Sequence, residues 1–97
     1  MKLFLDDERK PPLGWILVRW PEEAIKYLKS DEVEIISLDH DLGNDDHGTG
    51  YDVILWIEEE VMKNNFKPPK MIVHSANISA RIKMEAGIKN IYKLTKK

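Results

Sequence analysis

The chain of 97 residues contains no cysteine, and this absence removes several kinds of chemistry at once. Without thiols, the protein has no disulfides, no thiolate metal ligands and no cysteine nucleophile. An excess of charge of one sign is also missing, because 15 lysines and arginines face 17 aspartates and glutamates, for a formal net charge of −2. Strong non-specific binding to nucleic acid, which needs a basic surface, is therefore not expected.

Long apolar runs are lacking as well. No stretch approaches the length needed to cross a membrane, so no membrane partner is expected. The first residues, KLFLDD, are typical of a strand rather than of a signal peptide. The chain has no internal repeat, low-complexity segment or linker, and its composition is that of an ordinary globular protein. We therefore expect residues 1–97 to form one domain in the cytoplasm.

What the chain does contain is a regular alternation of short apolar runs and helical patterns. Strands are predicted over 2–5, 15–18, 34–38, 71–73 and 91–94, and helices over about 21–30, 51–64 and 78–85. Residues 8–14, ERKPPLG, contain two prolines and a glycine, which predicts a loop or a cramped crossover between the first two strands. Gly87 is expected to end the last helix. The alternation indicates an α/β layer fold with a mostly parallel sheet of four or five strands.

Three of the predicted strands end in polar side chains that can do chemistry. In parallel sheets, sites gather at the carboxyl ends of the strands, because those ends meet at one edge. The residues expected to converge there are Asp6–Asp7, Asp39–His40–Asp41 and His74–Ser75 with Asn77. The topology, rather than the polarity of the loops, is what places these groups together.

The aspartates supply the hard oxygen ligands that magnesium, manganese and calcium prefer. Asp39 and Asp41 lie two residues apart on an extended segment and point the same way, so they can share a ligand. Taken singly, each aspartate can equally cap a helix or solvate a loop. The two acidic clusters together favour a cation site built from Asp6, Asp7, Asp39 and Asp41.

His40 and His74 are candidate proton donors. His40 lies between two carboxylates that favour its protonated form, so it can serve as a general acid near neutral pH. By strand alternation, however, it can also face away from its neighbours and pack against the sheet. His74 directly follows Met-Ile-Val at the edge of the sheet, a place that suits a structural histidine as well as a catalytic one.

Four further residues are candidates for binding phosphate: Arg9, Ser75, Asn77 and Lys93. Arg9 offers a guanidinium directly after the first aspartate pair. Ser75 and Asn77 can donate hydrogen bonds at the end of the fourth strand. Lys93 would place an ammonium at the end of the fifth strand.

The segment 44–49 is expected to form a loop that can close over a ligand. Asp45, Asp46 and His47 lie in this glycine-framed stretch and are expected to be solvated. Of the aspartates in SLDHDLGNDDHGTG, Asp39 and Asp41 are therefore assigned to the site, and Asp45 and Asp46 to the loop.

With these residues in place, the chain resembles the response-regulator receiver superfamily. Paired acids after the first strand match Asp6–Asp7, the acid closing the third strand matches Asp39, and the hydroxyl residue after the fourth matches Ser75. The strand-five lysine of receivers matches Lys93. More closely, LFLDDER-PP-GW, SLDHDLG, TGYDV and HSAN resemble the cyclic-phosphate processing receiver domain over nearly the whole chain. The resemblance implies a doubly wound, flavodoxin-like fold of three α/β/α layers, here with a shortened first crossover.

The same resemblance carries two functional implications. In receivers, Asp39 would accept a phosphoryl group from a histidine kinase, with magnesium on Asp6 and Asp7. His40 and His74 depart from that pattern and point instead to an enzyme that acts on phosphate esters.

The preferred hypothesis is a metal-dependent phosphoesterase that processes cyclic phosphates derived from nucleotides or RNA, with Mg²⁺ or Mn²⁺ as cofactor. Asp39 would act as the nucleophile or orient the attacking water, and His40 or His74 would protonate the leaving oxygen. The alternatives are a divergent receiver that acts as a phosphoacceptor or non-catalytic signalling module, and a small protein that binds a phosphorylated nucleotide.

Overall fold

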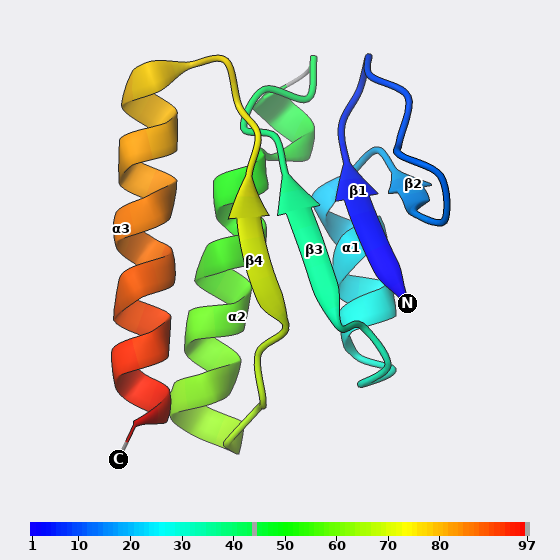
Figure 1. The fold of residues 1–97 in the computed structure, drawn as a ribbon. Helices are drawn as coiled ribbons and strands as arrows, with labels where there is room; N and C mark the ends of the chain where they lie inside the picture. The colour runs from blue at the N-terminus through cyan, green and yellow to red at the C-terminus, as the bar shows by residue number, and fades with distance from the viewer. Residues whose placement is uncertain (44, 97) are drawn as a thin grey trace.

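The computed structural model describes residues 1–43 and 45–96 (Figure 1). The elements follow the order β1 (Lys2–Leu5), β2 (Ile16–Val18), α1 (Pro21–Leu28), β3 (Ile35–Leu38), η1 (Asp45–His47), α2 (Gly50–Asn64), β4 (Lys70–Val73) and α3 (Ile78–Thr95). The expected loop over 44–49 falls partly outside the described residues at Asn44. From Asp45 onward it contains the short 3₁₀ turn η1, whose His47 ring stacks on Trp20 at a centroid distance of 4.3 Å.

The four strands form one parallel sheet, which confirms the predicted sheet type, and their order is β2-β1-β3-β4. No helix occurs between β1 and β2, where the proline-rich segment leaves too little chain for one. The crossover from β2 to β3 contains α1, and the crossover from β3 to β4 contains α2. The carboxyl ends of β1, β3 and β4 therefore lie side by side.

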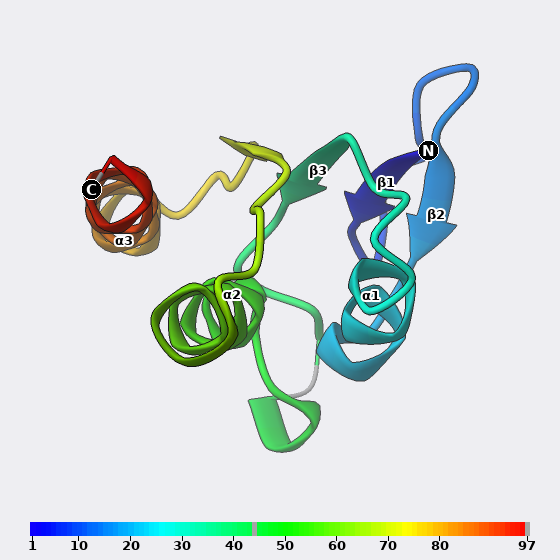
Figure 2. The same ribbon diagram turned by 90° about the horizontal axis from the view of Figure 1, so that it is seen from below.

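The helices do not sandwich the sheet. Figure 2 shows α1 and α2 on one face, with α3 standing beyond the free edge of β4. No helix of the described residues covers the other face, so two layers replace the three that the resemblance implied. The physical reason is that the β1–β2 crossover contributes no helix and the chain after β4 forms one long helix beside the sheet.

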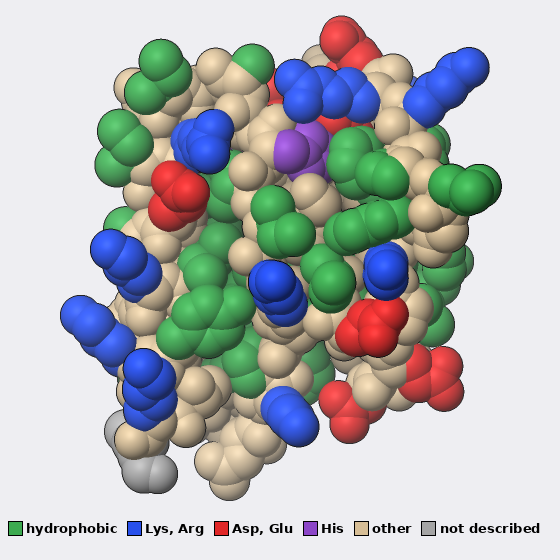
Figure 3. Space-filling model, in the orientation of Figure 1, with side chains coloured by type: hydrophobic (Ala, Val, Ile, Leu, Met, Phe, Trp, Pro, Cys, Tyr) green, Lys and Arg blue, Asp and Glu red, His purple; other side chains and the backbone are tan. Residues whose placement is uncertain are grey.

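Strand alternation separates the two faces of the sheet. Leu3, Leu5, Ile36 and Leu38 are fully buried against α1 and α2. The alternate positions face the uncovered side, where Leu17 and Ile72 are 49% and 39% exposed. Figure 3 shows this face as an apolar surface with basic side chains around it.

The predicted fifth strand over 91–94 is wrong, because these residues lie inside α3. The run IYKL is short enough to fit either a strand or a buried helical segment. In the structure, Ile88 and Ile91 continue the buried stripe of Met84 along the helix. Lys93 therefore lies in the last turn of α3, at the opposite end of the molecule from the carboxyl ends of the strands (Figure 1).

Gly87 does not end α3 as expected. A Cβ at this position would lie 2.9 Å from Cγ2 of Ile54, so the glycine lets α3 approach α2 closely. None of the helices in the described part of the chain combines the length and apolar character needed to cross a membrane.

The start of α2 is fixed against the end of β3. Thr49 and Asp52 form a capping box, in which the Thr49 amide donates to Asp52 Oδ2 at 2.8 Å. Gly50 follows and donates its amide to the carbonyl of His40 at 3.2 Å. A Cβ on Gly50 would collide with the backbone carbonyl of Asp39. The glycine therefore sets how closely α2 can hold the segment that presents Asp39.

We expect Gly50→Ala to destabilise the fold by about 3 kcal/mol, because a backbone carbonyl cannot move aside as a flexible side chain can. Chemical denaturation would measure the loss. Leu13→Ala is the control, since the side chain of Leu13 is fully exposed and its removal should change stability by less than about 0.5 kcal/mol. An unchanged midpoint for Gly50→Ala would contradict the close approach described here.

Candidate functional site

Polar side chains from β1, β3 and β4 meet at the carboxyl end of the sheet, as the sequence predicted. Three possible ligand atoms lie within 4.8 Å of one another, one each from Asp6, Asp39 and His74. Asp6 is almost completely buried, with 2% of its surface exposed. Beside these atoms is a hollow of about 300 Å³, lined by Asp6, Asp7, Glu8, Arg9, Asp39, Asp41, Gly43 and Ala76.

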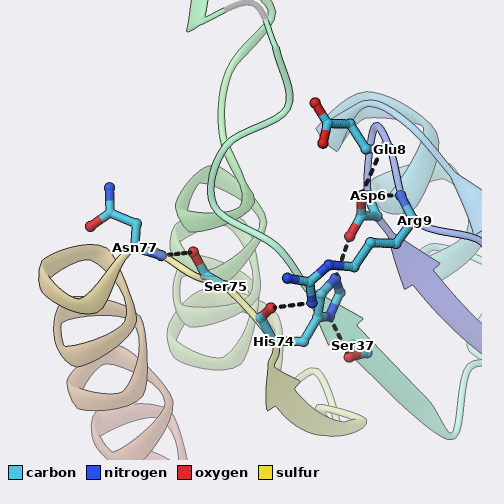
Figure 4. A network of polar contacts seen from close by, with 7 residues as sticks. All are labelled: Asp6, Glu8, Arg9, Ser37, His74, Ser75 and Asn77. Carbon is cyan, nitrogen blue, oxygen red and sulfur yellow. Dashed lines mark hydrogen bonds and ion pairs between the residues drawn. The ribbon is translucent and has the colours of Figure 1, made fainter.

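Asp6 is held by hydrogen bonds to both of its carboxyl oxygens (Figure 4). Oδ1 accepts from the amides of Glu8 at 2.8 Å and Arg9 at 2.9 Å, and Oδ2 lies 2.9 Å from Nε2 of His74. Burial acts to raise the pKa of Asp6, but these amides and His74 outweigh it, so the pKa lies below its usual value. Asp6 is thus a fixed carboxylate.

The ring of His74 is fixed on three sides. Nδ1 lies 2.7 Å from Oγ of Ser37, and Nε2 faces Asp6. Its ring stacks on Phe4 with centroids 4.3 Å apart and planes 5° from parallel. Both ring nitrogens are therefore engaged by protein atoms, which leaves neither one free to reach a substrate in this arrangement.

Asp39 sits at the end of β3, between Asp6 and Ser75. Burial, followed by the nearby charge of Asp6, raises the pKa of Asp39 above its usual value. His74, the backbone amide of His40 and the hydroxyl of Ser75 oppose that rise without cancelling it. Asp39 is the carboxyl group in this cluster that takes up a proton most readily.

Arg9 supplies positive charge at the mouth of the hollow. Its side chain is exposed, and Nη1 donates to the carbonyl of His74 at 3.1 Å (Figure 4). Among the described residues that line the hollow, five are acidic and Arg9 is the one basic side chain. The hollow therefore carries an excess of acidic side chains, with one cationic donor at its mouth.

The remaining acidic residues of the expected site lie around its rim. Asp7 and Asp41 line the same hollow, but neither joins the cluster of three ligand atoms. Oδ1 of Asp41 lies 2.8 Å from Nδ1 of His40. His40 itself does not line the hollow, which fits the alternative that it faces away from Asp39.

Three candidate phosphate ligands lie at different distances from the cluster. Ser75 is buried, accepts from the Asn77 amide at 3.2 Å and lowers the pKa of Asp39, so it belongs to the site. Asn77 caps α3, where its Oδ1 accepts from the Ala80 amide at 3.1 Å. Lys93 is outside the site because the segment predicted as a fifth strand is the end of α3.

Two residues of the site were missed from the sequence. Ser37 was assigned only to a strand, and Phe4 only to an apolar run. The available signal was Ser37 itself, a polar side chain inside the apolar strand IISL and at the same strand parity as Asp39. No sequence signal distinguishes Phe4 from other core residues.

The donor set suits a divalent cation. Two carboxylates and an imidazole nitrogen, with ligand atoms within 4.8 Å of one another, are donors of the kinds that divalent cations bind. An imidazole in the set favours Mn²⁺ or Zn²⁺ over Mg²⁺, because Mg²⁺ prefers oxygen ligands.

The family model of the cyclic-phosphate processing receiver domain matches residues 1–90 of the chain. No curated protein and no solved structure matches the chain. The matched range includes all the residues of the cluster and its rim.

Because its pKa is raised above the ordinary value of 3.8, ionised Asp39 costs folding free energy at neutral pH. We expect Asp39→Asn to raise the melting temperature at pH 7 by roughly 2–5 °C. Its advantage should disappear once the pH falls below 3.8, where the wild-type side chain is protonated in the folded and unfolded states alike. Calorimetry across this pH range would measure the effect.

Glu59→Gln is the matched control, because Glu59 is exposed and its carboxylate accepts from Lys63 at 2.7 Å. That substitution should bring no gain at pH 7. A lower melting temperature for Asp39→Asn at pH 7 would show that Asp39 stabilises the fold as an anion.

Proposed function

This chain belongs to the cyclic-phosphate processing receiver family, and we propose that it hydrolyses cyclic phosphates of nucleotides or RNA ends with a divalent cation. The observation that carries the proposal is the cluster of Asp6, Asp39 and His74 beside the exposed guanidinium of Arg9. Carboxylates alone repel a phosphate. A cation between them, with an arginine at the mouth, makes the same edge attractive to one.

A bound divalent cation would be held by Asp6, Asp39 and Nε2 of His74, and it would offset the negative charge of a phosphate. The fixed geometry of Asp6 supports this role, since two backbone amides orient its carboxylate before any ligand arrives.

Arg9 binds the non-bridging oxygens of the cyclic phosphate in this proposal. Its Nη1 contact to the His74 carbonyl uses one of five guanidinium N–H groups, so donors remain for a ligand. Charge that develops on these oxygens as water attacks phosphorus is then stabilised by a cationic donor.

Asp39 handles the proton. As a bond forms between the water oxygen and phosphorus, Asp39 takes one proton from that water. The bond from phosphorus to one ribose oxygen breaks, and the same carboxyl returns the proton to that oxygen. The product is a linear phosphomonoester. A carboxylate has two oxygens, so one can bind the cation while the other carries the proton.

This assignment differs from the expectation that His40 or His74 protonates the leaving oxygen. His40 does not line the hollow, and both nitrogens of His74 are engaged by Asp6 and Ser37. The two histidines therefore support roles outside proton transfer to substrate.

A phosphoaccepting receiver is the second candidate. The position of Asp39 at the end of β3, with the Ser75 hydroxyl near enough to lower its pKa, favours that reading. Against it stands the position of Lys93, which the resemblance placed at the site and the structure places at the far end of α3.

The test is turnover of nucleoside 2′,3′-cyclic phosphates in the presence of Mn²⁺, Mg²⁺ or chelator. We expect metal-dependent hydrolysis, reduced about 10²- to 10⁴-fold in Asp39→Asn because the proton carrier is lost. Arg9→Ala should reduce kcat/KM by about 10²-fold through lost charge stabilisation. Phosphorus NMR would follow the substrate and identify the product.

Glu59→Gln serves again as the control and should retain full activity, because Glu59 lies on α2 and does not line the site. Acetyl phosphate tests the rival: a stable acid-labile phosphoprotein without turnover of cyclic phosphates would establish the phosphoacceptor and exclude the hydrolase.

A further inference from the structure

Ser37 is a buried polar residue inside an otherwise apolar strand, with 5% of its surface exposed. Its Oγ lies 2.7 Å from Nδ1 of His74, which is the short end of the range for hydrogen bonds. The strand pairs Ser37 with Phe4 on one side and Ile72 on the other. A hydroxyl kept among such neighbours calls for an explanation through its one polar partner.

We propose that Ser37 is the positioning residue that lets His74 turn a lone pair at Nε2 toward a divalent cation. The inference rests on the proposed function, in which that cation is held by Asp6 and Asp39. It concerns how His74 becomes a ligand rather than whether the site hydrolyses phosphates.

Without a cation, the hydrogen-bond partners decide the tautomer of the imidazole. The Asp6 carboxylate only accepts, so Nε2 carries the proton and donates to Oδ2. Nδ1 is then an acceptor, and the Ser37 hydroxyl donates to it. In this state His74 offers no lone pair to a cation.

With a cation, the proton must leave Nε2. A neutral imidazole keeps one proton, so Nδ1 gains a proton as Nε2 loses one, with no net uptake or release. Nδ1–H then donates to Oγ of Ser37, and the Nε2 lone pair points between Asp6 and Asp39. Stacking on Phe4 keeps the ring in the same plane throughout.

A hydroxyl suits both states because it can donate and accept. A carbonyl in its place would accept only, which would fix the proton on Nδ1. A methyl group would do neither, and Nδ1 would be unpaired in a buried place. The serine hydroxyl therefore allows the exchange of tautomers without the loss of the hydrogen bond at Nδ1.

Nitrogen-15 NMR of the His74 ring, with Zn²⁺ as a diamagnetic probe, tests the proposal in the wild-type protein. We expect the Nε2–H tautomer without metal and the Nδ1–H tautomer at saturating Zn²⁺. An Nδ1–H tautomer in the absence of metal would overturn the proposal without requiring any variant.

Substitutions give a second, independent measurement. By calorimetry, Ser37→Ala should bind Zn²⁺ about 10- to 100-fold more weakly than wild type, the range seen when the hydrogen-bond partner of a metal ligand is removed. Ser37→Thr keeps the hydroxyl and should restore most of that affinity, and Ser79→Ala, on the exposed start of α3, should change nothing. Rescue by threonine separates positioning from mere packing.

The outcomes also separate this inference from the proposed function. Normal Zn²⁺ affinity in Ser37→Ala, with turnover intact in wild type, would refute the role of Ser37 and leave the hydrolase standing. Absence of Zn²⁺ binding in the wild-type protein would refute both.

Discussion

The hydrogen bond between Asp6 and His74 is the contact on which the arrangement of the site depends. The two residues follow β1 and β4, which are not neighbours, so the side chains meet across the end of β3. This crossing places Ser37 beneath the imidazole and Asp39 beside it. A sheet with another strand order would leave the same residues too far apart to share a ligand. The order of the strands thus brings residues that are distant in the sequence into one cluster.

The sequence was enough to place Asp6, Asp39 and His74 together, because parallel strands bring their carboxyl ends to one edge. The sequence was not enough to decide which residues near that edge face the hollow and which face away from it. Whether His40 or Asp39 faces the hollow depends on the exact residue at which β3 ends. Beyond β3, the Gly50 amide holds the carbonyl of His40, and Gly50 belongs to an element that starts later in the chain.

The end of the chain shows a different limit. The run IYKL fits strand and helix alike, and local pattern cannot choose between them. The close approach of α2 and α3 at Gly87 decides the matter, and that approach exists only once α2 is in place. The prediction that Lys93 binds phosphate at a strand end failed because residues 91–94 form part of α3 rather than a strand. The uncovered sheet face has the same origin, since it follows from which segments become helices rather than from any single residue.

The hollow at the edge of the sheet bears on the kind of reaction proposed for it. Its rim of Glu8, Arg9 and Asp41 is exposed, so solvent reaches its mouth. An enzyme that passes a phosphoryl group to another alcohol must keep competing water away from it. In the proposed reaction, an exposed rim would therefore favour water over another alcohol as the acceptor of the phosphoryl group.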